Sequence, residues 1–191
     1  MIIYLTTKNK TKRKISEKRI KESEAPSSIA KPRNWTKGQG SDPIYLNHRP
    51  ADAFGNPITL QHPVFATFIK DCEDITPNDV DYAFVLELVN SMSNVFEDED
   101  ARKDEFKRLY RKHYNISFIG YENKKTITDG STFSKGNMYM TSNLEAKPEM
   151  GVGNCCPYIQ SNAYYAKYIT TLPISIVSTA RLPCFLLYLI G

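Results

Sequence analysis

The sequence predicts an α/β fold, close to the border with α+β, in which helices pack on a small mixed sheet. Three observations support this. Apolar residues recur at helical spacing between residues 63 and 112, short β-prone segments follow Asn115, and Leu182–Ile190 is almost wholly apolar. A chain of 191 residues is long enough for one ordinary domain and a tail.

The first 41 residues are predicted to form a disordered basic arm. Residues 1–40 contain eleven Lys or Arg against three Glu, a net charge of +8, whereas the remainder carries a net charge of −4. Charged and Pro-, Ser- and Gly-rich stretches bury too little apolar surface to offset chain entropy. The run Lys10–Lys14 is typical of a nuclear-import or nucleic-acid-binding patch, and equally of a solvated basic arm. The negative net charge of the body argues against nonspecific duplex binding by a positively charged surface over the whole body. It does not exclude a local basic groove.

Three helices are predicted in the first part of the body, residues 42–191. After a loop-like lead-in over Tyr45–Ile58, His62 and Pro63 open the first helix, with proline in its first turn. Thr76 is expected to cap the second helix, and the acidic run Glu97–Asp100 suits the start of the third. The apolar stripes expected to be buried are Val64, Phe65, Phe68 and Ile69; Phe84, Val85, Leu88, Val89 and Met92; and Ala101, Phe106, Leu109 and Tyr110.

Strands dominate the second part of the body. The segments 116–121 and 126–128 are short and β-prone, whereas 138–144 is a weaker strand candidate because it contains several polar residues. Pro157–Ile169 has a helical pattern. Leu182–Ile190 suits a strand that is buried on both faces.

The remaining composition bounds the compartment. The four cysteines show no metal-binding spacing, which favours a reduced intracellular setting without disulfides. The N-terminal apolar run is too short for a secretory signal. Leu172–Gly191 carries Arg181 and two prolines, so a membrane span is not favoured. We therefore expect the nucleus or the cytoplasm, with unconventional secretion and the oligomeric state left open.

A carboxylate–lysine pattern is the main candidate site. Glu145 and Lys147 are two residues apart, so their side chains project from the same face of a strand. A loop over Gly130–Gly136 would let two antiparallel strands bring Asp129 close to Glu145. Two neighbouring carboxylates repel each other, and a divalent cation such as Mg²⁺ removes this cost while binding phosphate oxygens. Lys147 would then position water or stabilise charge on the phosphate.

Simpler interpretations are kept beside this one. Glu145 and Lys147 suit a solvent-facing strand, and Asp129 suits a turn beside glycine. Glu87 on the second predicted helix is a further acidic candidate, although charged helix residues are usually exposed. The three histidines show no ligand spacing, and the tyrosines of the helix 157–169 are favoured as packing residues rather than base-stacking ones.

Several stretches resemble fungal crinkler-like and fungal-type kinase-associated proteins with a divergent PD-(D/E)XK, restriction-endonuclease-like module. In chain order they are Tyr45–Leu60, His62–Phe65, Thr128–Gly130, Glu145–Gly151, Pro157–Gln160, Tyr164–Tyr165 and Leu182–Cys184.

The resemblance implies a restriction-endonuclease-like domain over residues 42–191, with a core cut short at its C-terminus. It implies Asp129 and Glu145 as Mg²⁺ ligands, Lys147 as the catalytic lysine and Gln160 as a helix residue facing the site. The implied function is a metal-dependent nuclease-like module acting on DNA, within an effector-type protein. The alternative is a catalytically inactive interaction module that keeps the nuclease fold.

Overall fold

The computed structural model describes most of the body of the chain and part of the N-terminal arm. The described residues are 2–3, 18, 20, 22–38, 45–46, 58–123, 126–136, 139–148, 154–180 and 182–190. The run Lys10–Lys14 and most of the lead-in Tyr45–Ile58 lie outside them, so the predictions made for these segments are not addressed by the structure.

The described elements are helices with a small amount of sheet, which agrees with the predicted mixed α/β or α+β class. The helices are α2 (Pro26–Ile29), α3 (Pro32–Gly38), α4 (Ile58–Gln61), α5 (Pro63–Asp74), α6 (Asp79–Met92), α7 (Glu99–Tyr114), α8 (Pro157–Ile169) and α9 (Ile174–Thr179). The strands are β1 (Ile2–Ile3), β2 (Tyr45–Leu46), β3 (Glu122–Asn123), β4 (Thr126–Ile127), β5 (Gly130–Phe133), β6 (Met140–Lys147) and β7 (Phe185–Ile190).

The main sheet has the strand order β5–β6–β7. β5 runs antiparallel to β6, and β6 runs parallel to β7, from the pair Ser142–Phe185 to the pair Lys147–Ile190. A parallel pair requires a crossover, which α8 and α9 provide. The short pairs β1–β2 and β3–β4 form separate two-stranded sheets, and an isolated bridge joins Ile119 to Ser131.

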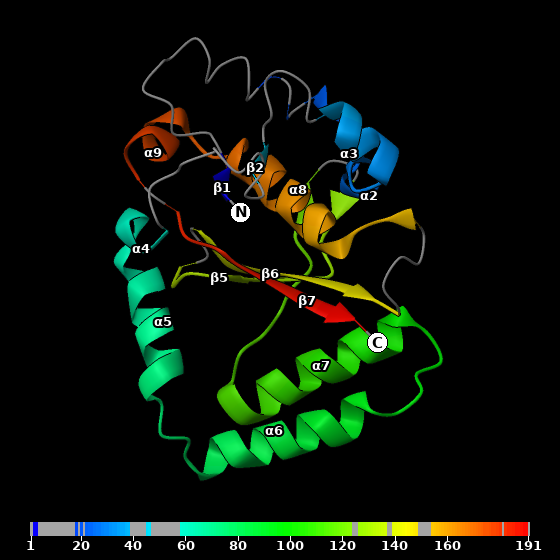
Figure 1. Ribbon diagram of the computed structural model, residues 1–191, viewed down its shortest axis with the longest axis vertical. Coiled ribbons are helices and arrows are strands. Elements are labelled where there is room, and N and C mark those ends of the chain that lie inside the picture. Colours follow the sequence, from blue (N-terminus) through cyan, green and yellow to red (C-terminus); the bar gives the residue numbers. More distant parts are fainter. Residues whose placement is uncertain are drawn as a thin grey trace.

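Helices cover both faces of this sheet. α8 crosses one face, α7 lies on the opposite face, and α6 packs beneath α7 (Figure 1). α5 stands at the side of the sheet, where Phe65 and Phe68 contact Phe185 of β7. β6 is therefore the central strand, with a helix above and a helix below it.

Local signals explain where the central helices begin and end. His62 caps α5 by accepting a hydrogen bond from the backbone N–H of Val64 at 3.2 Å, with Pro63 in the first turn, as predicted. α6 is capped by Asn78 rather than Thr76, because Asn78 and Asp81 form a reciprocal capping box. Asp98 caps α7, which ends at Asn115 in the left-handed conformation (φ 54°).

Two apolar clusters lie on the two sides of β6. The α8 side contains Ile20, Met140, Ala163, Tyr165, Ala166, Tyr168, Ile169 and Val177, and the α7 side contains Phe106, Phe118 and Leu144. Strict alternation would place Met140 and Leu144 on one face of β6. A β-bulge in the pairing of Thr132 and Phe133 inserts one extra residue, and this places Met140 on the opposite side from Leu144.

The prediction of a disordered arm is wrong for the described residues from Ile20 to Gly38. Ile20 is 1% exposed, and α2 packs against α8, where the backbone N–H of Cys156 donates to the carbonyl of Ala30 at 3.1 Å. Lys167 of α8 donates to the carbonyl of Ser23 at 3.0 Å. A few apolar residues in a polar context are enough for docking when a neighbouring helix supplies the rest of the core.

Burial predictions for three elements are also wrong. No residue of the predicted stripe of α5 is buried, and Phe68 and Ile69 are 50% and 44% exposed. β7 is a strand, as predicted, but it lies at the end of the sheet order, and all six of its residues are half-buried rather than buried. In α6 only Phe84 is buried, whereas Val85 and Val89 are 53% and 56% exposed. All three elements have an open side in the described part of the chain, so an apolar pattern alone overstated their burial.

Candidate functional site

The polar residues of β6 line a buried layer beneath α8. Asn143 is fully buried and donates to the side-chain oxygen of Ser161 at 2.7 Å, while its own oxygen accepts from Ser131 at 3.2 Å. These bonds explain why a strand with a polar sequence lies in the core, since buried polar groups are tolerated when they are hydrogen-bonded. The layer continues along the same face of the strand to Glu145 and Lys147.

Asp129 is held against β6 by a backbone hydrogen bond. It lies one residue before β5, and its Oδ2 accepts from the N–H of Ala146 at 2.8 Å. Lys103 of α7 lies 3.8 Å from its Oδ1. The bonded residue, Ala146, stands between Glu145 and Lys147, so the carboxylate of Asp129 is fixed beside both.

Glu145 is the most deeply buried charged residue among those described. It is 1% exposed, and Lys147 Nζ lies 2.8 Å from its Oε1. This contact lacks hydrogen-bond geometry, and neither carboxylate oxygen of Glu145 has a hydrogen-bond partner in the described part of the chain. Burial, and then the nearby charge of Asp129, raise the pKa of Glu145 to about 8, while Lys147 opposes the rise.

Lys147 lies among three oxygen atoms. Its Nζ donates to Glu99 Oε1 at 3.2 Å and to the carbonyl of Ala146 at 2.8 Å, and it pairs with Glu145. Burial favours the neutral amine, but the contacts with Glu145 and Glu99 outweigh burial and raise the pKa of Lys147. The ammonium group therefore stays charged and marks a position that favours a cation.

Gln160 enters from the first turn of α8. It is 6% exposed, and its side-chain oxygen accepts a hydrogen bond from the Cys155 thiol at 2.6 Å. One turn later, Tyr164 has its pKa raised to about 12, first by burial and then by the charges of Glu145 and Asp129, while a hydrogen bond with Gln160 lowers it. Tyr164 therefore lies within electrostatic range of both carboxylates.

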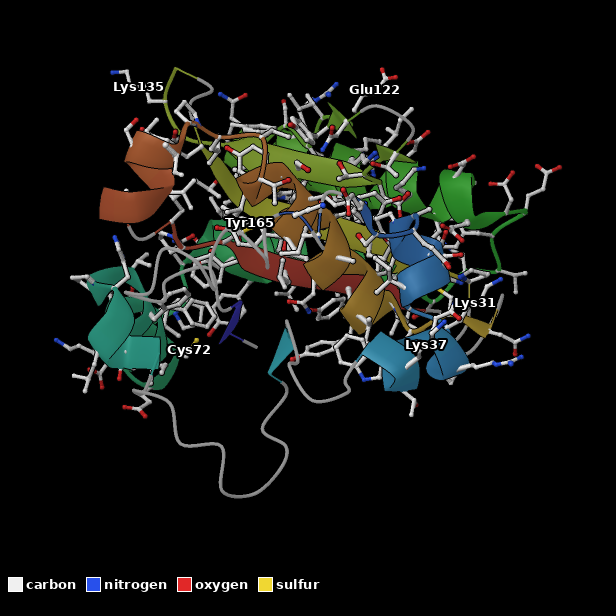
Figure 2. The ribbon with its side chains drawn as sticks, turned by 90° about the horizontal axis from the view of Figure 1, so that it is seen from above. Lys31, Lys37, Cys72, Glu122, Lys135 and Tyr165 are labelled. Carbon is white, nitrogen blue, oxygen red and sulfur yellow. The ribbon has the colours of Figure 1, made fainter. Side chains whose placement is uncertain are left out.

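The fold brings three of the four predicted site residues together at one end of β6. Glu145 and Lys147 are paired, and Asp129 is bonded to the backbone of Ala146 between them. Gln160 is bonded to Cys155 on the α8 side, and no hydrogen bond or ion pair joins it to these three residues in the described part of the chain. The packing residue Tyr165 lies inside the body, whereas Glu122 lies at the periphery (Figure 2). Because Glu145 is 1% exposed, its interpretation as a solvent-facing strand residue is wrong.

Sequence reasoning missed three contributors. Glu99 of α7 contacts Lys147, Lys103 approaches Asp129, and Tyr164 joins Gln160. Glu99 belongs to the acidic run that was assigned to the helix dipole, and the sequence holds no signal that this helix begins beside Lys147. The four-residue spacing of Glu99 and Lys103, which places both on one side of a helix, was the only indication in the sequence that they act together.

Glu87 lies elsewhere. It accepts from Lys112 at 2.6 Å and from Arg108 at 3.1 Å, and it contacts His113 at 2.7 Å, on the surface shared by α6 and α7. These contacts, Lys112 first, lower the pKa of Glu87 to about 2. Glu87 is thus a half-buried ion-pair residue on the surface shared by α6 and α7, outside the carboxylate–lysine site.

The residues at the end of β6 fit a Mg²⁺ ion. No group of three or more His, Cys, Asp and Glu side chains suited to a metal occurs among the described residues. Mg²⁺ does not need one, because it keeps several waters and binds proteins through one or two carboxylates together with substrate phosphates. The buried carboxylate of Glu145, with Asp129 close enough to raise its pKa, is of this kind.

Within the described residues, no helix is both long and apolar enough to cross a membrane. Comparison of the chain with family models, curated proteins and solved structures finds no match, so the resemblance to restriction-endonuclease-like proteins stays a prediction.

Proposed function

We propose that this chain is a Mg²⁺-dependent phosphodiesterase module of divergent restriction-endonuclease-like type that acts on DNA. The observation that carries the proposal is the carboxylate of Glu145, which is 1% exposed and has the ammonium of Lys147 as its close partner at 2.8 Å. Structural ion pairs are usually exposed or fully hydrogen-bonded, because an unsatisfied buried charge is costly. A buried carboxylate that is maintained despite this energetic cost is typical of a functional site.

Asp129 and Glu145 would hold the metal ion, and Glu99 stands close enough to Lys147 to adjust the charge around it. Bound Mg²⁺ would polarise the phosphodiester and lower the pKa of the attacking water. Its binding also requires Glu145 to be ionised. Because the pKa of Glu145 is raised, this residue would release a proton near neutral pH when it holds the ion.

The residues of the chain have separate roles in hydrolysis. The water oxygen forms a bond to phosphorus as the ester bond to the leaving sugar oxygen breaks, and a proton passes from the water to the released alkoxide. Lys147 stays charged and stabilises the negative charge that develops on the phosphate oxygens. Gln160 and Tyr164 are neutral polar residues of α8, and their side chains would orient water and the phosphate.

The topology around the site is compatible with this proposal. A mixed sheet with helices on both faces carries the carboxylates at the end of its central strand, and a helix follows that strand before the parallel partner. The assignment to a crinkler-like, effector-type protein rests on the sequence resemblance alone. Nuclear or cytoplasmic localisation is part of the same proposal.

The experiment is cleavage of supercoiled plasmid in Mg²⁺ by the purified chain. Glu145→Gln and Lys147→Met keep side-chain size and remove the charges, and each is expected to reduce cleavage at least about 100-fold. Glu122→Gln is the matched control, because Glu122 is exposed and belongs to the separate β3–β4 sheet, and it should cleave like the wild type. Circular dichroism confirms that all three variants are folded.

A second function is favoured by a different observation. α6 exposes apolar side chains, among them Leu86 at 65%, Val85 at 53% and Val89 at 56%. Large exposed apolar patches mark protein contacts. The alternative is therefore an inactive interaction module. A folded wild-type chain that binds Mg²⁺ but leaves plasmid intact, with the same background as both site variants, would contradict the nuclease proposal and favour this alternative.

A further inference from the structure

The cations of α7 divide into those with partners and those without. Four of its six Lys and Arg residues are engaged. Arg102 lies over the ring of Phe96 at 5.0 Å, Lys103 pairs with Asp100, Arg108 pairs with Glu87 and Glu105, and Lys112 pairs with Glu87. Lys107 and Arg111 form no ion pair or side-chain hydrogen bond with any described residue. These two cations are four residues apart and therefore share one side of the helix.

This side of α7 leads away from the carboxylate centre. Glu99, Lys103, Lys107 and Arg111 follow one another at four-residue steps. Glu99 contacts Lys147, and Lys103 approaches Asp129. The next two positions in the line are the cations without partners, at steps of about 6 Å along the helix.

The stem of Lys107 is packed rather than solvated. A side chain at Gly130, the residue after Asp129, would place its Cβ 3.1 Å from Cε of Lys107. The absence of a side chain at Gly130 therefore leaves room for the lysine to lie over the start of β5. Burial, and then the neighbouring charge of Lys103, lower the pKa of Lys107. The carboxylates of Asp104, Asp129 and Asp100 act in the opposite direction, but none of them forms an ion pair with Lys107. A half-buried ammonium without an ion-pair partner is a favourable position for an anion.

We propose that Lys107 and Arg111 bind the phosphodiester backbone of DNA and hold it along α7 toward Asp129 and Glu145. The proposal rests on the proposed nuclease function and names its substrate contact. Lysine binds phosphate as a point charge and arginine as a fork of donors, and neither contact depends on base sequence. An anion at this position also offsets the repulsion between Lys103 and Lys107.

The test is binding of a fluorescein-labelled 20-base-pair duplex to the full chain in EDTA, measured by anisotropy over a range of salt concentrations. EDTA prevents cleavage. The double variant Lys107→Gln/Arg111→Gln is expected to bind at least about tenfold more weakly. The slope of log K against log salt should fall in magnitude by about 2, because two phosphate contacts are lost.

The matched control is Arg108→Gln/Lys112→Gln. It removes the same charge from the same helix, but from the side that faces Glu87. It should retain most of the affinity and a slope close to that of the wild type. Equal losses of DNA affinity in the two double variants would show that only net charge matters, and this would overturn the proposal. A Lys107→Gln/Arg111→Gln variant that binds DNA like the wild type would also overturn it.

Failure of this inference and failure of the proposed function are distinguishable. If the wild type cleaves plasmid in Mg²⁺ but Lys107→Gln/Arg111→Gln cleaves with an unchanged KM, Lys107 and Arg111 are not phosphate contacts and the nuclease function stands. If the wild type does not cleave, yet its binding in EDTA depends on Lys107 and Arg111 as expected, the DNA contact stands without the catalytic role. Active wild-type protein with a raised KM and a preserved kcat in the variant supports both.

Discussion

Two glutamates in this chain have neighbouring cations and opposite acidities. Glu145 lies 2.8 Å from Lys147 and has a pKa raised to about 8, whereas Glu87 contacts Lys112, Arg108 and His113 and has a pKa lowered to about 2. The difference lies in solvent and in hydrogen bonding. The side chain of Glu87 is 28% exposed and accepts from several cationic groups, while Glu145 is 1% exposed, has Lys147 alone as a cationic partner among the described residues and is affected by the charge of Asp129. A nearby cation therefore does not by itself make a carboxylate acidic.

The largest expected effect is on the pH dependence of stability in metal-free protein. Because the pKa of Glu145 is higher in the folded state than the ordinary value of 4.5, the folded state holds its proton more tightly. Its contribution to the free energy of unfolding is present below pH 4.5 and is lost as the pH rises to about 8. The loss is on the order of 4 kcal/mol. Urea unfolding at pH 5 and pH 8.5, in EDTA, measures it.

Glu145→Gln should remove this pH dependence and make the protein more stable than the wild type at pH 8.5. Glu122→Gln serves as the control and should follow the wild type. A wild-type free energy of unfolding that rises between pH 5 and pH 8.5, and rises equally in Glu145→Gln, would contradict the assigned acidity.

Removal of the cation is expected to have the next largest effect. Lys147→Met leaves the Glu145 carboxylate without its nearest positive charge, so the variant should lose about 3 kcal/mol at pH 8.5. The loss should be smaller at pH 6, where Glu145 is largely neutral. A double-mutant cycle with Glu145→Gln gives the coupling, and independent effects of the two substitutions would show that the pair is not energetically linked.

Mg²⁺ should stabilise the wild type by a smaller amount, about 2.7 kcal/mol at a concentration one hundred times its Kd. The stabilisation should be greater at pH 8.5 than at pH 6, because the ion binds the ionised form of Glu145. Differential scanning fluorimetry with and without Mg²⁺ checks this. Neither Glu145→Gln nor Asp129→Asn is expected to respond, and a full response in both variants would place the ion elsewhere.

The smallest effect on stability is expected for substitution of Glu87, the second glutamate of the comparison. Glu87→Gln breaks contacts with Lys112 and Arg108, but these groups are solvated, so the melting temperature should change little. Because the folded-state pKa of Glu87 is low, any contribution is present at pH values above 4.5 and is lost as the pH falls toward 2. A large loss of stability at neutral pH would mean that this surface cluster is a structural centre.

The sequence allowed the mixed fold and the four long helices α5, α6, α7 and α8 to be predicted, because capping residues and helical spacing are local signals. His62 before Pro63 and the acidic start of α7 are examples. The packing of Ile20 on α8 and the open sides of β7 and α6 were not predictable, since they depend on which surfaces meet. Periodicity indicates an apolar face but not whether another element covers it.

The candidate site was predictable to a similar extent. The spacing of Glu145 and Lys147 on a strand placed them on one face, and the loop after Asp129 allowed the approach that the structure shows. The polar stretch before Glu145 argued against a core strand, because its partners Ser131 and Ser161 come from other elements. Glu99 and the line of cations from Lys103 to Arg111 required the position of α7, which spacing cannot supply.

The bulge between β5 and β6 divides the hairpin into two parts that tolerate change differently. Between the bulge and Lys147, an inserted or deleted residue would turn Glu145 to the α7 face and separate it from Gln160. On the far side of the bulge, toward Lys135, a change of length moves the turn without turning the carboxylate. Loop grafts, affinity tags or fluorescent insertions in this protein are therefore best placed at the hairpin tip, and strand segments from Ser142 onward are best left at their present length.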